Sequence, residues 1–127
     1  MPHGLGHNMG IDEHDMEDIG EDMEGYDDDQ KREGGIGLAN LRMARRLVPG
    51  NVVTDEPGIY FIPDLIAQWK RDGLDRGRVN YALLEREYLN FGGIRLEDDV
   101  LVTAEGARRL GSSRLPIASS DIEELMK

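Results

Sequence analysis

The sequence contains no cysteine, which excludes disulfide bonds, thiolate metal ligands and a cysteine nucleophile. It also lacks any run of apolar residues approaching the roughly 20 that an α-helix needs to span a bilayer. Basic residues are few, since 15 Lys and Arg stand against 26 Asp and Glu, giving a formal net charge of -11. This imbalance argues against nucleic acid or a membrane as a partner, and it favours a soluble, cytoplasmic protein. Any bound metal must therefore use nitrogen and oxygen ligands.

Much of the negative charge lies near the N-terminus. Eleven of the eighteen residues from Asp12 to Asp29 are Asp or Glu. Such a segment cannot bury enough apolar surface to offset its ordering entropy, so we expect a solvated acidic loop at about residues 15–35. A calcium loop built on Asp27-Asp28-Asp29 is the alternative, but the alternating ligand spacing, central glycine and closing glutamate of such loops are missing.

Apolar periodicity and turn residues predict a mixture of short helices and strands. Helical spacing followed by Pro or Gly predicts helices at 38–48, 62–72 and 81–88. Extended runs predict strands at 51–54 and 58–61, a hairpin or bulged pair of 94–97 with 100–103 across Asp98-Asp99, and a further extended piece after Gly106. A capping box of Ser120 and Glu123 predicts a last helix that ends at Met126.

Three short motifs carry the chemistry. The first is His3-Gly4-Leu5-Gly6-His7, followed by His14. Glycine and the preceding Pro2 disfavour a helix, so the two histidines of the motif do not share a helix face. The glycines would instead allow close approach of the backbone to a metal or a substrate. Surface histidines in a loop are the plainer alternative.

The second motif is Thr54-Asp55-Glu56-Pro57-Gly58-Ile59-Tyr60-Phe61, in which a rigid turn can hold the Glu56 carboxylate at the end of a strand. A solvated turn glutamate is the alternative. Because a second buried carboxylate would be costly without a partner, we expect Asp55 to point away from Glu56 or to be paired.

The third motif is Phe91-Gly92-Gly93-Ile94-Arg95-Leu96-Glu97-Asp98-Asp99. Arg95 and Glu97 are two residues apart, so in a strand they face the same side. They could form a surface ion pair worth about 0–1 kcal/mol. The planar guanidinium of Arg95 also suits a peptide carboxylate, and Glu97 could be a metal ligand.

Together, and in this order, the three motifs resemble the proline-specific dinuclear metallopeptidases of the pita-bread fold, the Xaa-Pro dipeptidases (prolidases) and Xaa-Pro aminopeptidases. The resemblance runs over residues 1–127 and covers about the C-terminal half of the family's catalytic domain. It implies an α+β fold of the creatinase/aminopeptidase type, a curved antiparallel sheet with helices on its outer face. In the intact enzyme, a metal-bridging hydroxide would attack the peptide bond before proline.

The resemblance also implies roles for individual residues. It implies three metal ligands: His7, Glu56 and Glu97. It implies four catalytic residues, among which the glutamate transfers a proton: His3, His14, Glu56 and Arg95. Three of these would also bind substrate: His3, His14 and Arg95. In the family, two further aspartate ligands come from a strand upstream of the histidine motif, and neither is in this chain.

The implied cofactors are two divalent ions, Mn²⁺ with Co²⁺ or Zn²⁺ as alternatives. The implied partners are short proline-containing peptides, the missing N-terminal half of the same enzyme and a second copy in a homodimer. Because the first motif begins at His3, we expect a fragment that is inactive in isolation. One alternative is a non-catalytic pita-bread domain used for binding or as a scaffold. Another is a metal-independent, creatinase-like hydrolase, which the retained Glu56 and Glu97 disfavour.

Overall fold

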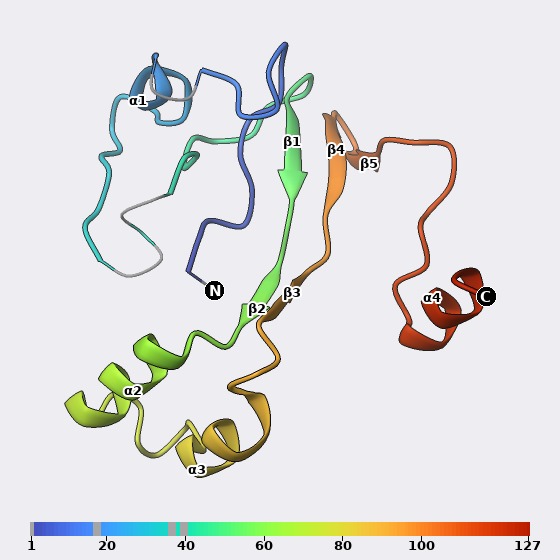
Figure 1. The fold of residues 1–127 in the computed structure, drawn as a ribbon. Coiled ribbons are helices and arrows are strands. Elements are labelled where there is room, and N and C mark those ends of the chain that lie inside the picture. Colours follow the sequence, from blue (N-terminus) through green and yellow to red (C-terminus); the bar gives the residue numbers. More distant parts are fainter. Residues whose placement is uncertain (1, 17–18, 36–37, 39–40) are drawn as a thin grey trace. The chain divides into compact units, whose positions relative to one another are not determined.

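The regular elements of the chain are short antiparallel strands and short helices, which agrees with the predicted α+β class (Figure 1). The computed structural model describes residues 2–16, 19–35, 38 and 41–127. These residues form two units, which we call the helical unit, Gly58–Arg95, and the sheet unit, Pro2–Pro57 with Leu96–Lys127.

Three antiparallel strands form the centre of the sheet unit, in the order β1-β4-β5. Strand β1 spans Val52–Asp55, β4 spans Asp98–Thr103, and β5 spans Gly106–Arg109. β-Branched residues fill most of β1, as expected for a central strand. Two neighbours cover its edges, β4 on one side and a segment near the N-terminus on the other.

The predicted hairpin across Asp98-Asp99 is wrong. Asp98 and Asp99 lie inside β4, opposite residues of β1. The chain reverses later, where Thr103 pairs with Gly106. Gly106 has φ 145°, a conformation that favours glycine, whereas neither aspartate offers this freedom.

The helical unit begins and ends with a two-stranded antiparallel ladder of β2, Gly58–Tyr60, and β3, Gly93–Arg95. Helix α2, Pro63–Asp72, follows β2, with a proline in its first turn. It ends as predicted at Gly73, whose φ is 74° and whose amide donates to the Lys70 carbonyl.

The predicted helix at 81–88 is present, but its second half is π-helical. It consists of α3, Tyr81–Leu83, and η1, Leu84–Tyr88. Asn80 caps it by accepting a hydrogen bond from the Leu83 amide at 3.0 Å.

The predicted helix at 38–48 is absent from 41–48, and residues 39 and 40 lie outside the described residues. Here tertiary hydrogen bonds replace helical ones, since the amides of Ala44 and Arg45 both donate to the carbonyl of Gly25. Local periodicity alone could not reveal this distant acceptor.

Where the structure describes it, the acidic segment is largely exposed, as its composition suggests, but it is anchored at several points. This part contains a short helix, α1, Glu21–Glu24, and the buried Tyr26. Arg46 forms ion pairs with Asp27 at 3.0 Å and Asp29 at 2.7 Å. The hydrogen bond and charge of Arg46 lower the pKa of the Asp29 carboxyl.

The last helix, α4, Ser119–Leu125, is present, but the predicted capping box is not. The N-cap is Ala118, and no side chain caps the helix. Ser120 lies inside the first turn, where its hydroxyl donates to the Asp121 carboxylate.

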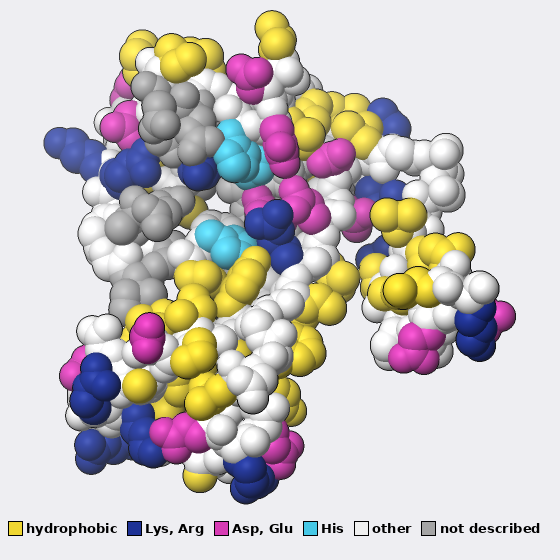
Figure 2. All heavy atoms as spheres, viewed as in Figure 1, with side chains coloured by type: hydrophobic (Ala, Val, Ile, Leu, Met, Phe, Trp, Pro, Cys, Tyr) yellow, Lys and Arg dark blue, Asp and Glu magenta, His cyan; other side chains and the backbone are white. Residues whose placement is uncertain are grey.

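Few apolar side chains are buried among the described residues. The sheet unit buries Tyr26 and Val53, and the helical unit buries Ile66 and Tyr81. Figure 2 shows many other apolar side chains at the surface, and Ile59 and Ile94, which pair across β2 and β3, are among those exposed. No helix among the described residues has the length and apolarity needed to cross a bilayer.

We expect Gly73→Ala to fray the end of α2, because an alanine in the left-handed conformation costs about 1 kcal/mol. The amides of Gly73 and Leu74, which bond to the last carbonyls of the helix, should exchange roughly fivefold faster. Gly77→Ala is the matched control, because nothing lies within 4 Å of its added Cβ. Equal exchange rates in the two variants would contradict this account of the helix end.

Candidate metal centre

The segment that carries the first histidine motif lies along β1. The Glu56 amide donates to the Leu5 carbonyl at 2.8 Å, and the Thr54 amide donates to the His7 carbonyl at 3.0 Å. Further along, Asn8 forms an isolated antiparallel bridge with Val53. The motif is therefore extended, as predicted, and its pairing with β1 brings His7 close to the end of that strand.

Gly6 makes this close pairing possible. A Cβ atom built on Gly6 would lie 1.9 Å from the carbonyl oxygen of Thr54 and 2.8 Å from its carbonyl carbon. Backbone atoms cannot swing aside as a flexible side chain can, so any larger residue must push the two segments apart. The glycine thus serves close approach between two backbones. The approach of backbone to metal or substrate that the sequence suggested stays a prediction.

The pairing of β1 with β4 places two glutamates opposite each other. Asp55 pairs with Asp98, and one step beyond, the Leu96 amide donates to the Pro57 carbonyl at 3.1 Å. Glu56 and Glu97 are the opposed positions between these two contacts. Successive strand residues face opposite sides. Asp55 therefore points away from the buried Glu56 and is exposed, as predicted.

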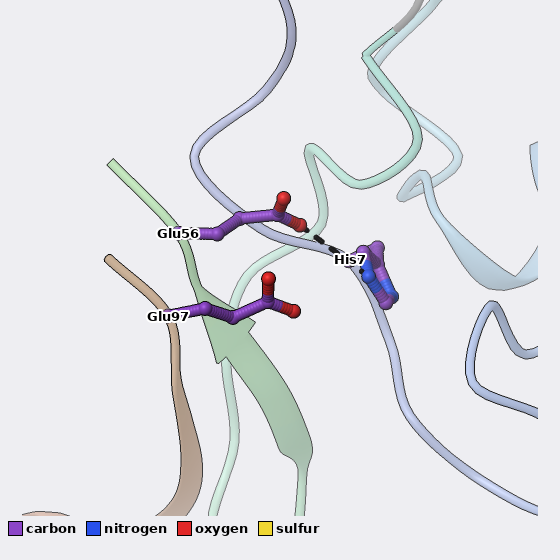
Figure 3. Close-up of side chains that lie close together, drawn as sticks. All are labelled: His7, Glu56 and Glu97. Carbon is purple, nitrogen blue, oxygen red and sulfur yellow. Dashed lines mark ion pairs between the residues drawn. The ribbon is translucent and has the colours of Figure 1, made fainter. Parts of the chain in front are cut away.

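His7, Glu56 and Glu97 converge. Each offers one ligand atom, and these three atoms lie within 4.8 Å of one another. Both carboxylates extend toward the His7 ring (Figure 3), with His7 Nε2 and Glu56 Oε1 3.3 Å apart. His7 and Glu56 are only 5% and 6% exposed, whereas Glu97 lies open to solvent.

The orientation of the His7 ring suits a metal ligand. Its Nδ1 lies 3.0 Å from the Asn8 carbonyl oxygen, which can only accept a hydrogen bond. Nδ1 therefore carries the proton, and in the neutral ring Nε2 presents its lone pair to Glu56. Metal-binding histidines commonly hold the ring in this way, through a carbonyl bonded to the other nitrogen.

The spacing of donor atoms also fits a shared ion. Two donors that bind one ion at roughly 2.0–2.2 Å lie about 3.0–3.4 Å apart for ordinary coordination angles. The 3.3 Å separation of His7 Nε2 and Glu56 Oε1 falls in this range. Two like charges that face each other across a ladder are destabilising, and a cation between Glu56 and Glu97 would remove that repulsion.

Of the other predicted site residues, the structure places one beside His7 and leaves the contact of the other two with the metal ligands untested. The His14 ring packs edge-on against the His7 ring, with centroids 4.2 Å apart, so the structure brings these two histidines together. His3 is half-buried, and its Nδ1 lies 2.7 Å from the Gly4 carbonyl oxygen. Arg95 ends β3 in the helical unit, where it pairs with Gly58 and is exposed. Its place beside Glu97 stays a prediction.

Arg42 lies nearer to the histidines than its sequence position suggested. A small cavity of about 10 Å³ is lined by His7, His14, Asp15 and Arg42, among others. The sequence showed this arginine only as part of a predicted helix at 38–48. No local signal indicated that the chain would bring it back to the histidine motif.

Within the described part of the chain, His7, Glu56 and Glu97 form the one group of three or more ligand side chains close enough to share an ion. Asp27 and Asp29 are instead bound to Arg46. This geometry does not support the calcium-loop alternative.

Comparison with known proteins matches residues 1–104 to the sequence profile of Metallopeptidase family M24. The chain is 43% identical over 126 residues to an Xaa-Pro dipeptidase of Rattus norvegicus and 42% identical over 126 residues to that of Homo sapiens. Each match covers 99% of this chain and 24% of the relative. A protein of Botryotinia fuckeliana named "Probable Xaa-Pro aminopeptidase" is 36% identical over 127 residues, 100% of this chain and 24% of its own. The chain thus spans about a quarter of the length of these relatives.

Gly6→Ala is expected to separate the histidine segment from β1. The amides of Thr54 and Glu56, which donate to this segment, should lose their protection against hydrogen exchange, as measured by NMR. Gly34→Ala is the control, because nothing lies within 4 Å of the added Cβ. Retained protection in Gly6→Ala would show that the two backbones are not held as closely as described.

Proposed function

Because this chain belongs to metallopeptidase family M24, we propose that it forms part of an enzyme that hydrolyses the peptide bond before proline. The substrates would be short proline-containing peptides. Since the chain spans about a quarter of its relatives, the rest of the catalytic domain would lie outside residues 1–127. In this proposal the two sheets here belong to the curved sheet of a pita-bread domain, of which the chain is a C-terminal part.

One observation carries the proposal, the convergence of His7, Glu56 and Glu97 from three separate stretches of the chain. Their nitrogen and oxygen donors suit divalent ions such as Mn²⁺, Co²⁺ or Zn²⁺. Two ions would need further carboxylates, which we propose come from outside this chain. We propose Mn²⁺ as the resident ion and a homodimer as the complete enzyme.

The residues of this chain would divide the chemistry among them. When bound, the ions would polarise the scissile carbonyl and lower the pKa of water. Glu56 is hydrogen-bonded by the Thr54 hydroxyl at its Oε1, and would move a proton between the attacking water and the leaving amine. His14, stacked edge-on against His7, and His3 would steady negative charge on the substrate.

Two arginines are candidates for holding the C-terminal carboxylate of a dipeptide. We propose Arg95 on the basis of its motif, since a planar guanidinium can bind a carboxylate with two hydrogen bonds. Arg42 is the competing candidate, because it lines the cavity beside His7 and His14.

The first test is metal binding by the 127-residue chain itself. We expect weak binding of one Mn²⁺, and we expect Glu97→Gln to weaken it more than about tenfold, because the amide lacks the charge of a carboxylate. Free Mn²⁺ is counted by electron paramagnetic resonance during a titration.

Glu105→Gln is the matched control, since it removes the same charge from the exposed turn between β4 and β5. Equal affinities in both variants would remove Glu97 from the site. A wild-type chain that binds no Mn²⁺ would favour the non-catalytic scaffold.

The second test is catalysis. The chain alone should show negligible Xaa-Pro hydrolysis with added Mn²⁺, and co-production with the upstream segment of its gene should restore it. In that complex, Arg95→Lys should lower kcat/KM for a free dipeptide about tenfold more than for a C-terminally amidated peptide, because a point charge cannot replace a two-pronged hydrogen bond.

Arg42→Lys is assayed beside it with the same two substrates. A selective loss in Arg42→Lys and not in Arg95→Lys would transfer the carboxylate contact to Arg42. Strong activity of the isolated chain would contradict the proposal that the site is incomplete.

A further inference from the structure

Thr54 is a buried polar residue, 4% exposed, for which the motifs suggested no role. It lies in β1 two residues before Glu56, so both side chains point to the same side of the strand. Its hydroxyl donates to Glu56 Oε1 at 3.0 Å. The hydroxyl oxygen of Thr54 itself accepts a hydrogen bond from the His7 backbone amide, also at 3.0 Å.

These contacts form a directed chain. The His7 amide can only donate and the Glu56 carboxylate can only accept, so the hydroxyl proton of Thr54 must point at Glu56. Hydrogen bonds arranged in series polarise one another, which strengthens each of them in a buried setting. The backbone amide of Thr54 also donates to the His7 carbonyl at 3.0 Å. One residue therefore holds the backbone of one proposed ligand and the side chain of another.

From this geometry we propose that Thr54 is a positioning residue that sets His7 and Glu56 at the separation a shared metal ion requires. The inference rests on the proposed function, because it assumes that these two residues are metal ligands. The observed 3.3 Å between His7 Nε2 and Glu56 Oε1 is the quantity that Thr54 would fix. It touches neither the ion nor the substrate in this account.

The β-branched shape of threonine adds to this role. Two heavy atoms on Cβ restrict the side chain to few rotamers, so the hydroxyl is held between its two partners. Valine has nearly the same shape and favours strands equally well, but it can neither donate nor accept. Serine keeps the hydroxyl and loses the restriction. The two substitutions therefore separate the hydrogen bonds from the packing.

The test compares Thr54→Val and Thr54→Ser in the 127-residue chain. Thr103→Val is the control, since Thr103 lies in β4 and its hydroxyl donates to the Gly106 carbonyl of the local turn. The first readout is made without metal. NMR couplings of Glu56 should report one side-chain rotamer in wild type and Thr54→Ser and averaged rotamers in Thr54→Val, with a shifted His7 amide resonance.

The second readout is Mn²⁺ affinity. Thr54→Val should weaken binding roughly 10–100-fold, as expected when a residue that orients a ligand is lost, while Thr54→Ser and Thr103→Val stay close to wild type. A Thr54→Val chain that keeps both a single Glu56 rotamer and wild-type affinity would overturn the inference. So would a loss in Thr54→Ser as large as that in Thr54→Val, because serine keeps the hydroxyl and the loss would then not follow the hydrogen bonds.

If the proposed function is wrong, the two readouts give a different combination of results from the one expected when only the role of Thr54 is wrong. A wild-type chain without Mn²⁺ binding would overturn the metal centre, and the metal-free rotamer measurement would still decide whether Thr54 orders Glu56 and His7. An ordered Glu56 in Thr54→Val would then reject Thr54 as a positioning residue outright.

Discussion

The antiparallel pairing of β1 with β4 is the constraint on which the candidate site depends. It sets Glu56 against Glu97, although 40 residues separate them in the sequence. Two carboxylates so placed repel each other, and a sheet normally avoids such pairs. A cation between them would relieve this repulsion. A slip of β4 by one residue would turn Glu97 to the face opposite Glu56 and separate the two carboxylates.

The strands and the main helix could be predicted because their signals are local. The runs at 51–54 and 58–61 agree with β1 and β2 to within about a residue at their ends. Gly73 ends α2, as expected for a glycine that directly follows the last helical residue. The convergence of three motifs was also expected, but only from their resemblance to a known family. Spacing alone gives no distance between residues 7, 56 and 97.

Several of the failures share a cause, which is competition from distant partners. The segment 41–48 has helical periodicity, yet its Ala44 and Arg45 amides donate to the distant carbonyl of Gly25. The hairpin at Asp98-Asp99 was placed too early because the pairing of β4 with β1 is a long-range contact. Arg42 and Thr54 were missed for the same reason. A role for an arginine or a threonine can be inferred only when the residues that it contacts in the folded chain are known.

The small number of buried apolar side chains has a thermodynamic consequence. Heat capacity rises on unfolding in proportion to the apolar surface that becomes exposed. Among the described residues, each unit buries only two apolar side chains, so unfolding of this chain alone would release little such surface. Its stability curve would be shallow and its response to denaturant weak. Covering Ile59, Ile94 and the other exposed apolar side chains would steepen both responses.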